Sequence, residues 1–208
     1  MDAAAPKDAR LQSVVRQITA WNRRSSKDSV AFTYMYFWGR AYQDLYSERS
    51  FSRFLSSSRK QIDIHAPEER ERAAAALEEA LYRIQKHFGK IDVPWGHVNV
   101  VVRRGTFPLD GNGLYNVLHP DGGIEQENGQ IHCDDGWGHL MIVTEGETKE
   151  IWSLLPLGES EDRASPHYND QAKLHSQGQI KRFWFTSQDI LDHTESVWGN
   201  KSRISLHP

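Results

Sequence analysis

A dense run of reactive side chains lies between Ser165 and Gln171. In order it contains Ser165, Pro166, His167, Tyr168, Asn169, Asp170 and Gln171. A hydroxyl from Ser165 or Ser160, paired with the His167 imidazole and oriented by Asp170, would form a nucleophilic triad. The serine and the imidazole must lie within hydrogen-bond reach, and Ser165 is too close to His167 in sequence for easy attack geometry. No Gly-x-Ser-x-Gly elbow accompanies the run.

The same run also suits a structural loop. Ser165 is a good N-cap for a short helix, and Pro166 fits the first turn of that helix. The side chains of His167, Tyr168 and Gln171 would then bond neighbouring backbone groups. We favour this structural interpretation, so we assign no catalytic residue within the chain.

A second group holds residue types that bind zinc. It consists of His132, Cys133, Asp134, Asp135 and His139, with His119 upstream. Its spacing matches neither a zinc finger nor an HExxH helix. Neighbours on an extended segment point to opposite faces, so His132 and Cys133 would not share one metal. We interpret the segment as a polar turn and predict no metal site and no cofactor.

Two glycine-containing segments, Gly111–Gly113 and Gly136–Gly138, lack the third glycine or the lysine of a nucleotide-binding fingerprint. We interpret both as turns. The charge-rich stretch from Glu68 to Glu79 is typical of a solvated helix face with i,i+4 pairs.

The first half of the sequence predicts three helices from its apolar periodicity. The first spans Leu11 to Trp21, and the second begins at a cap formed by Asp28 or Ser29. The third runs from Pro67 to a left-handed stop at Gly89. The residues that mark them are Leu11, Val14, Val15, Ile18 and Trp21; Phe32, Tyr36, Phe37, Trp38 and Tyr42; and Leu77, Leu81, Ile84 and Phe88. The second helix is apolar on more than one side, so we expect it to be buried or to form an interface.

After Pro94 the pattern becomes that of strands. Val98, Val100 and Val102 alternate with other residues, which predicts a strand through Arg103. The other expected elements are a turn at Asp110–Gly113, a hairpin of Leu140–Val143 and Ile151–Leu155 around a turn at Glu145–Thr148, a short helix at Gln171–Ser176 and a strand at Arg182–Phe185. We therefore expect an α+β fold in a single domain, residues 1–208, mainly helical over 1–90 and mainly antiparallel β over 91–208.

Composition narrows the function classes. The 208 residues are 38% hydrophobic and 11% aromatic, which is typical of a folded globule. A net charge of −3 excludes the basic footprint of a nucleic-acid binder. The single cysteine, Cys133, excludes an internal disulfide. No stretch has the apolar length of a signal peptide core or a membrane span, so we expect no membrane association and, by default, a cytoplasmic chain.

Three segments together carry a family signature. They are Val93–Val98 with Val102–Gly105 and Pro108–Gly113; Gly136–Val143 running into Leu154–Ser160; and Ala164–Gln171. In order and spacing they resemble the C-terminal part of the β chain in the penicillin acylase family of N-terminal nucleophile amide hydrolases, which includes acyl-homoserine lactone acylases. The signature residues are Trp95, Gly96, Arg104, Gly105, Ser165, Pro166, His167, Tyr168, Asp170 and Gln171. The family run has Gln where this chain has Glu159.

The resemblance implies part of an αββα sandwich. It also implies an enzyme that hydrolyses the amide between an acyl group and an amine, through an acyl-enzyme on the N-terminal Ser of the β chain. No residue here matches that Ser, the acyl pocket or the oxyanion-hole Asn, and the chain begins Met1-Asp2.

We therefore expect a penicillin-acylase-like amide hydrolase chain, acting on an acylated amine, antibiotic or secondary metabolite, that lacks the nucleophile region. An upstream acylase chain would supply the nucleophile and dock on the second helix. The alternative is a truncated, non-catalytic family member that binds or stabilises a partner or associates with itself.

Overall fold

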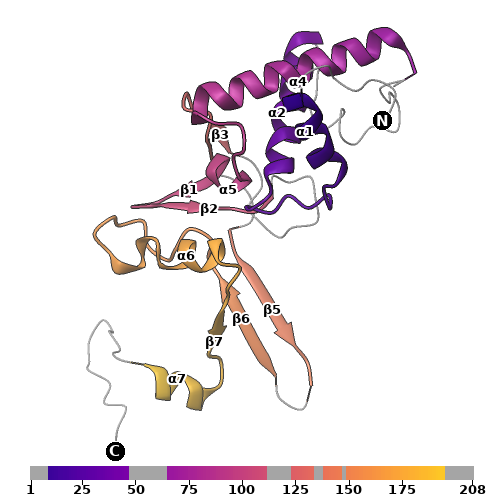
Figure 1. Ribbon diagram of the computed structural model, residues 1–208. Helices are drawn as coiled ribbons and strands as arrows, with labels where there is room; N and C mark the ends of the chain where they lie inside the picture. The colour runs from indigo at the N-terminus through magenta and orange to yellow at the C-terminus, as the bar shows by residue number, and fades with distance from the viewer. Residues whose placement is uncertain (1–8, 47–64, 112–122, 134–137, 147–148, 195–208) are drawn as a thin grey trace, which may run out of the picture.

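The computed structural model describes residues 9–46, 65–111, 123–133, 138–146 and 149–194. Figure 1 shows a helical body at one end and a projecting hairpin at the other, joined by a small sheet and a short helix. Helices and antiparallel or mixed sheets both contribute, which confirms the expected α+β class. Among the described residues, none of the helices combines the length and hydropathy that crossing a membrane requires.

The helical body consists of α1 (Ala9–Thr19), α2 (Val30–Tyr46) and α4 (Pro67–Phe88), as the periodicity predicted. In Figure 1, α4 lies across α1 and α2. Phe32 and Tyr34 of α2 are fully buried, and Phe37 is 3% exposed. Because α1, α4 and the segment after α4 cover α2 on several sides, most of its apolar residues belong to the internal core. The docking surface expected on this helix is therefore used largely within the chain.

The helix ends follow the sequence signals. The Ser29 hydroxyl accepts a hydrogen bond from the Phe32 N–H at 3.1 Å, so Ser29 rather than Asp28 caps α2. Gly89 ends α4 with a φ of 73°, and its N–H donates to the Gln85 carbonyl. A left-handed residue at this position costs least when it is glycine.

A four-stranded mixed sheet follows the helices, in the order β2-β1-β4-β3. A helical turn, α5 (Trp95–Val98), leads into β1 (Asn99–Val102), β2 (Thr106–Pro108), β3 (Ile124–Glu125) and β4 (Ile131–His132). The predicted strand is confirmed as β1, but its alternation was wrong, because Val98 ends the helical turn and Val102 is 46% exposed. Both Val100 and Val101 are buried, since β1 is an inner strand that is covered on both faces.

A second sheet contains β5 (Leu140–Thr144), β6 (Glu150–Leu154) and β7 (Lys181–Phe183), antiparallel and in that order. The predicted hairpin is confirmed, with Leu140 opposite Leu154 and Thr144 opposite Glu150. Residues 147–148 of its predicted turn lie outside the described residues.

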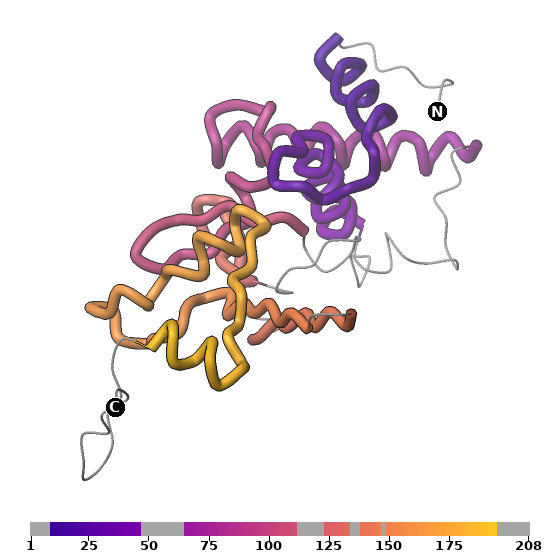
Figure 2. The backbone as a smooth tube through the Cα atoms, turned by 90° about the horizontal axis from the view of Figure 1, so that it is seen from below, coloured from indigo at the N-terminus to yellow at the C-terminus, as the bar shows by residue number. Residues whose placement is uncertain are grey.

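Short helices connect and follow these strands: η1 (Pro166–Tyr168), α6 (Asp170–Ser176) and α7 (Ser187–His193). The sequence predicted the first two, but α7 was missed although Thr186 caps it by accepting the Asp189 N–H. A small core of Val101, Leu109, Cys133 and Ala172 joins α6 to the first sheet. Figure 2 shows most of the chain after β5 lying to one side of the α1–α4 body, which α6 contacts through a hydrogen bond from Lys27 Nζ to the Ser176 carbonyl at 2.5 Å.

Candidate functional site

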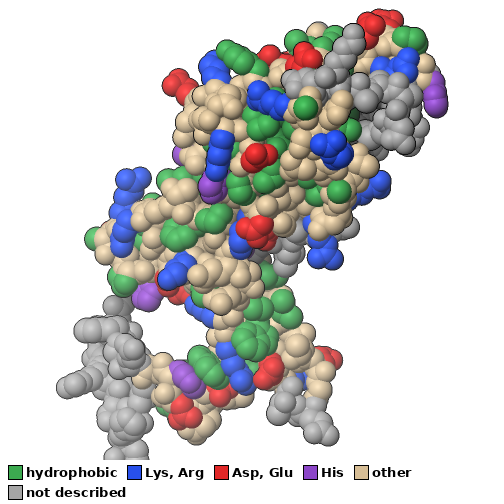
Figure 3. Space-filling model, viewed as in Figure 1, with side chains coloured by type: hydrophobic (Ala, Val, Ile, Leu, Met, Phe, Trp, Pro, Cys, Tyr) green, Lys and Arg blue, Asp and Glu red, His purple; other side chains and the backbone are tan. Residues whose placement is uncertain are grey.

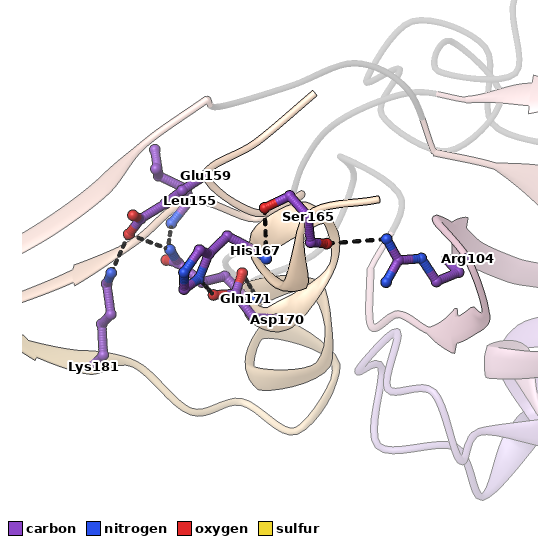
Figure 4. A network of polar contacts seen from close by, with 8 residues as sticks. All are labelled: Arg104, Leu155, Glu159, Ser165, His167, Asp170, Gln171 and Lys181. Carbon is purple, nitrogen blue, oxygen red and sulfur yellow. Dashed lines mark hydrogen bonds and ion pairs between the residues drawn. The ribbon is translucent and has the colours of Figure 1, made fainter. Parts of the chain in front are cut away.

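The two signature residues with acid–base chemistry, His167 and Asp170, are paired. His167 Nδ1 lies 3.0 Å from Asp170 Oδ2, at the junction of η1 and α6 (Figure 4). The pair is open to solvent, since the His167 side chain is 63% exposed and that of Asp170 is 37% exposed.

The nearby hydroxyl groups are engaged with the backbone. Ser165 Oγ accepts the His167 N–H at 3.1 Å and so caps η1, the role indicated by its position before Pro166. Ser160 Oγ accepts the Asp162 N–H at 3.1 Å. Across the described ranges, no hydrogen bond joins either hydroxyl to the His167 imidazole. The nucleophile–base contact that a triad requires is therefore not formed.

Gln171 connects α6 to the end of β6. The residue is 1% exposed, and its Oε1 accepts the Leu155 N–H at 2.8 Å. Its Nε2 donates to Glu159 Oε1 at 2.7 Å. Figure 4 shows that this carboxylate also meets the Lys181 ammonium from β7. The buried Gln171 side chain thus ties α6 to the loop after β6, and Glu159 of that loop is in turn bonded to β7.

Glu159 occupies the position where the resemblance leads us to expect Gln. The hydrogen bond from Lys181 holds the pKa of its carboxyl below the ordinary value, with a further contribution from Gln171, against an opposing effect of burial. The added negative charge is therefore compensated within the loop by a cation from the neighbouring strand.

Gly158 allows the loop to pass close to η1. Its φ is 110°, and a methyl group placed on it would lie 2.6 Å from the carbonyl oxygens of both His167 and Tyr168. Because the loop passes so close to η1, the N–H of the next residue, Glu159, donates to the His167 carbonyl at 2.9 Å. Only glycine fits this position without movement of the backbone.

Arg103, at the end of β1, holds the loop from the other side. Its Nε donates to the Tyr168 carbonyl and its Nη2 to the Ser160 carbonyl, both at 2.9 Å. Asn169 Nδ2 donates in return to the Arg103 carbonyl at 2.9 Å. Sequence reasoning singled out only the neighbouring Arg104, which donates to the Ser165 carbonyl at 3.0 Å. The sequence signal that could have predicted the contacts of both arginines is their position directly before Gly105.

Gly105 completes the turn between β1 and β2. Its carbonyl accepts the Arg103 N–H at 2.9 Å, while Arg104 has a φ of 47°. This left-handed turn directs both arginine side chains toward the loop at residues 158–171, which we call the clasp.

The remaining signature residues, Trp95 and Gly96, form a separate group beneath the helical body. Trp95 is fully buried, and its Nε1 donates to the Gly111 carbonyl at 2.6 Å. Gly96 donates its N–H to the Lys27 carbonyl at 2.7 Å, and a methyl group there would lie 2.7 Å from Pro108 Cβ. The signature therefore marks two packing points, not one reaction centre.

Only three of the six candidate metal ligands, His132, Cys133 and His139, lie among the described residues. Within the described ranges, no three His, Cys, Asp or Glu residues are grouped to hold a metal ion. His132 Nε2 lies 3.5 Å from Gln130 Oε1, and Cys133 is buried. His119, Asp134 and Asp135 lie outside the described residues, as do residues 112–113 and 136–137 of the two glycine segments.

His139 makes a contact that sequence reasoning missed. Its Nε2 lies 2.9 Å from the Ser153 hydroxyl, across β5 and β6. Ser153 is 5% exposed, and no carboxylate hydrogen-bonds to His139 among the residues described. The pair therefore lacks the third, orienting group of a triad.

Comparison with known proteins identifies the family. The family model for penicillin amidase matches residues 2–192. This chain belongs to the penicillin amidase family. The resemblance inferred from the three sequence segments is thereby confirmed.

A curated relative shows how much of a family protein this chain covers. It is 27% identical over 198 residues to the acyl-homoserine lactone acylase PvdQ of Pseudomonas fluorescens (strain Pf0-1), which is 88% of this chain and 24% of the relative. The chain thus spans about a quarter of the length of this curated relative. The solved structure of a thermostable penicillin G acylase from Alcaligenes faecalis aligns with a TM-score of 0.40 and 15% identity, over 98% of this chain and 44% of that one.

Proposed function

We propose that this chain is the scaffold part of a penicillin-amidase-family amide hydrolase, and that a separate acylase chain supplies the nucleophilic serine. Membership of the family supports the reaction class. The chain aligns with 24% of the length of the curated relative, and no residue of the sequence matches the family's nucleophilic serine.

The proposed reaction is hydrolysis of a non-peptide C–N amide bond in an acylated amine, such as an antibiotic or another secondary metabolite. The serine oxygen of the partner chain attacks the carbonyl carbon, the C–N bond breaks, and the amine leaves with a proton. Water then attacks the resulting ester and releases the acid. The relative's name supports an N-acyl-homoserine lactone as the first substrate to assay.

The scaffold role is supported by the hydrogen bonds of the polar side chains in the clasp, which are made largely to backbone groups. Ser165 Oγ accepts a backbone N–H, and the buried Gln171 side chain bonds both Leu155 and Glu159. A catalytic hydroxyl needs a base within reach, whereas these groups satisfy the backbone of a loop. In this proposal the clasp holds α6 and the second sheet in fixed positions for the partner's active site.

The experiment is a reconstitution. The chain is mixed with a family polypeptide that begins with the catalytic serine, and release of free amine from an N-acyl-homoserine lactone is measured. We expect turnover only when both chains are present. Turnover by this chain alone, or none from the mixture, would contradict the proposal.

A non-catalytic family member that binds or stabilises a partner is the second candidate. The exposed apolar surface of the second sheet favours it, because binding needs such a surface and no nucleophile. A stable complex without turnover, on every N-acyl amine assayed, would identify this role.

A further inference from the structure

The second sheet presents apolar side chains on both of its faces. Residues paired directly across strands point to the same face. Val143, Ile151 and Phe183 are paired across the three strands and define the first face. Ile142 and Trp152 are paired and define the second. Val143 is 51% exposed, Phe183 is 43% exposed and Ile142 is 40% exposed, so the described residues leave both faces open at these positions.

The apolar surface extends beyond these pairs. Met141, next to Val143 on the first face, is 47% exposed. Ile190 and Leu191 of α7, which follows β7, are 50% and 47% exposed. Figure 3 shows hydrophobic side chains gathered over this end of the molecule in the view of Figure 1. Exposed apolar side chains gathered in this way are typical of an interaction site.

Strands that are apolar on both sides are those that lie inside layered folds. The chain itself shows the comparison, because Val100 and Val101 of the inner strand β1 are both 1% exposed. Within the described residues β5 pairs only with β6, so its outer edge also offers unpaired backbone groups. The second sheet has apolar residues on both faces, as the inner layer of a layered fold does, but the described residues leave both faces exposed.

We propose that the β5–β6–β7 sheet is the docking surface for the separate family polypeptide, which covers both faces of the sheet and pairs with the edge of β5. This inference rests on the proposed function, and names the surface through which the partner chain binds. The curated relative is about four times as long as the part that this chain matches, so a full-length family polypeptide is large enough to form two covering layers.

A second copy of this chain fits the β5–β6–β7 sheet less well than the family polypeptide does. A twofold dimer buries the same surface on each copy. Contact through Val143 and Phe183 would therefore leave Ile142 and Trp152 open, and the reverse contact would leave the first face open. A partner that covers both faces must be larger than one repeated sheet.

The test measures binding of the chain to the genomically encoded family polypeptide that carries the remaining family length. Val143→Lys charges the first face, and Ile142→Lys charges the second. Tyr82→Lys is the matched control, because Tyr82 is 61% exposed on α4, in the helical body. We expect each sheet variant to weaken the dissociation constant at least tenfold, and the control to change it less than twofold.

Hydrogen exchange provides a readout that needs no variant. The amides of β5 are expected to gain protection in the complex, because edge pairing buries them. The proposal is overturned if hydrogen exchange at Leu140–Thr144 is unchanged in the complex. It is also overturned if only one of the two variants, Val143→Lys or Ile142→Lys, weakens binding. Concentration-dependent dimers that Val143→Lys disrupts, with no binding of the family polypeptide, also overturn it. So does a source genome that encodes no such polypeptide.

The outcomes separate docking from chemistry. A complex that is sensitive to both sheet variants but hydrolyses no N-acyl-homoserine lactone supports the docking surface and contradicts the hydrolase function. Turnover that neither sheet variant affects supports the function and overturns the docking surface.

Discussion

Arg103 contacts Tyr168 in two ways at once. The Arg103 Cζ atom lies 4.0 Å from the centroid of the Tyr168 ring, and Arg103 Nε donates to the Tyr168 carbonyl at 2.9 Å. A guanidinium is suited to this geometry, because its planar face stacks on an aromatic ring while its edge donates hydrogen bonds. The contact fixes η1 against the end of β1.

Replacing Arg103 should therefore destabilise the clasp. Its side chain is 11% exposed, and Arg103→Ala leaves the Tyr168 and Ser160 carbonyls without their donor. We expect a loss of about 2–3 kcal/mol in the free energy of unfolding, measured by urea denaturation. Arg104→Ala is the matched control, expected to cost less than about 1 kcal/mol because its one hydrogen bond is exposed and its Cζ lies farther from the Tyr168 ring centroid, at 5.6 Å. Equal losses from the two variants would show that Arg103 has no special role.

A substitution at Gly158 tests whether the loop must pass close to η1. Gly158→Ala places a methyl group 2.6 Å from two carbonyl oxygens at a φ of 110°. We expect a loss of about 3 kcal/mol or more, from steric overlap and backbone strain together. Gly178→Ala separates these causes, because Gly178 has a φ of 67° with no atom within 4 Å of the added group. It should cost about 1 kcal/mol by thermal or chemical denaturation, and a similar cost at both positions would contradict the packing argument.

Gly96 tests the second packing point of the family signature. A methyl group there would lie 2.7 Å from Pro108 Cβ and 2.9 Å from Lys27 Cβ. We expect Gly96→Ala to cost about 1–3 kcal/mol of unfolding free energy. Gly138→Ala is the control, since nothing lies within 4 Å of its added methyl group and it should be within about 0.5 kcal/mol of the parent chain. A neutral Gly96→Ala would mean that α5 can shift away from β2.

Acid should weaken the Glu159–Lys181 pair. The pKa of Glu159 in the folded chain lies below its ordinary value of 4.5, chiefly because Lys181 donates to it. A lowered folded pKa stabilises the protein above the ordinary value, and this stabilisation is lost as the pH falls through the folded pKa. Because both side chains are about two-fifths exposed, at 42% and 41%, the contribution should be less than about 1 kcal/mol.

The comparison that isolates this effect uses Glu159→Gln. The amide keeps an acceptor for Gln171 but does not titrate, so the variant should lose less unfolding free energy than the parent chain between pH 6 and pH 3. Parallel pH profiles for the two proteins would contradict a stabilising pair.

Sequence patterns predicted the long elements and the ends that side chains determine. The helices α1, α2 and α4 follow from apolar periodicity, Gly89 from the need for a left-handed stop, and the β5–β6 hairpin from two apolar runs around a turn. Ser165 was predicted to cap a short helix because a hydroxyl before proline suits that position, and it does.

The missed elements are those that tertiary contacts determine. α5 has four residues, and it is held by Trp95 packing against Phe32 and by Gly96 bonding to Lys27. The two-residue strands β3 and β4 carry no period of their own. The role of Arg103 also depends on partners more than fifty positions away, which local spacing does not reveal.

The exposed sheet shows a further limit of sequence reasoning. Apolar runs at Leu140–Val143 and Ile151–Leu155 predicted the two strands of the hairpin, but not whether the chain covers them. The apolar second helix was expected to be the open surface, and the structure buries most of it. Which apolar segment is left uncovered depends on the arrangement of the others, so it becomes visible only in three dimensions.

The most direct test of the scaffold role is the hydrolysis rate of the reconstituted complex with His167→Ala. This variant removes the 3.0 Å contact with Asp170 but leaves the backbone cap of Ser165 in place. We predict that release of amine from an N-acyl-homoserine lactone requires both chains and that His167→Ala changes kcat less than twofold. Turnover by this chain alone, abolished by His167→Ala without loss of folding, would contradict the account and make the clasp an active site.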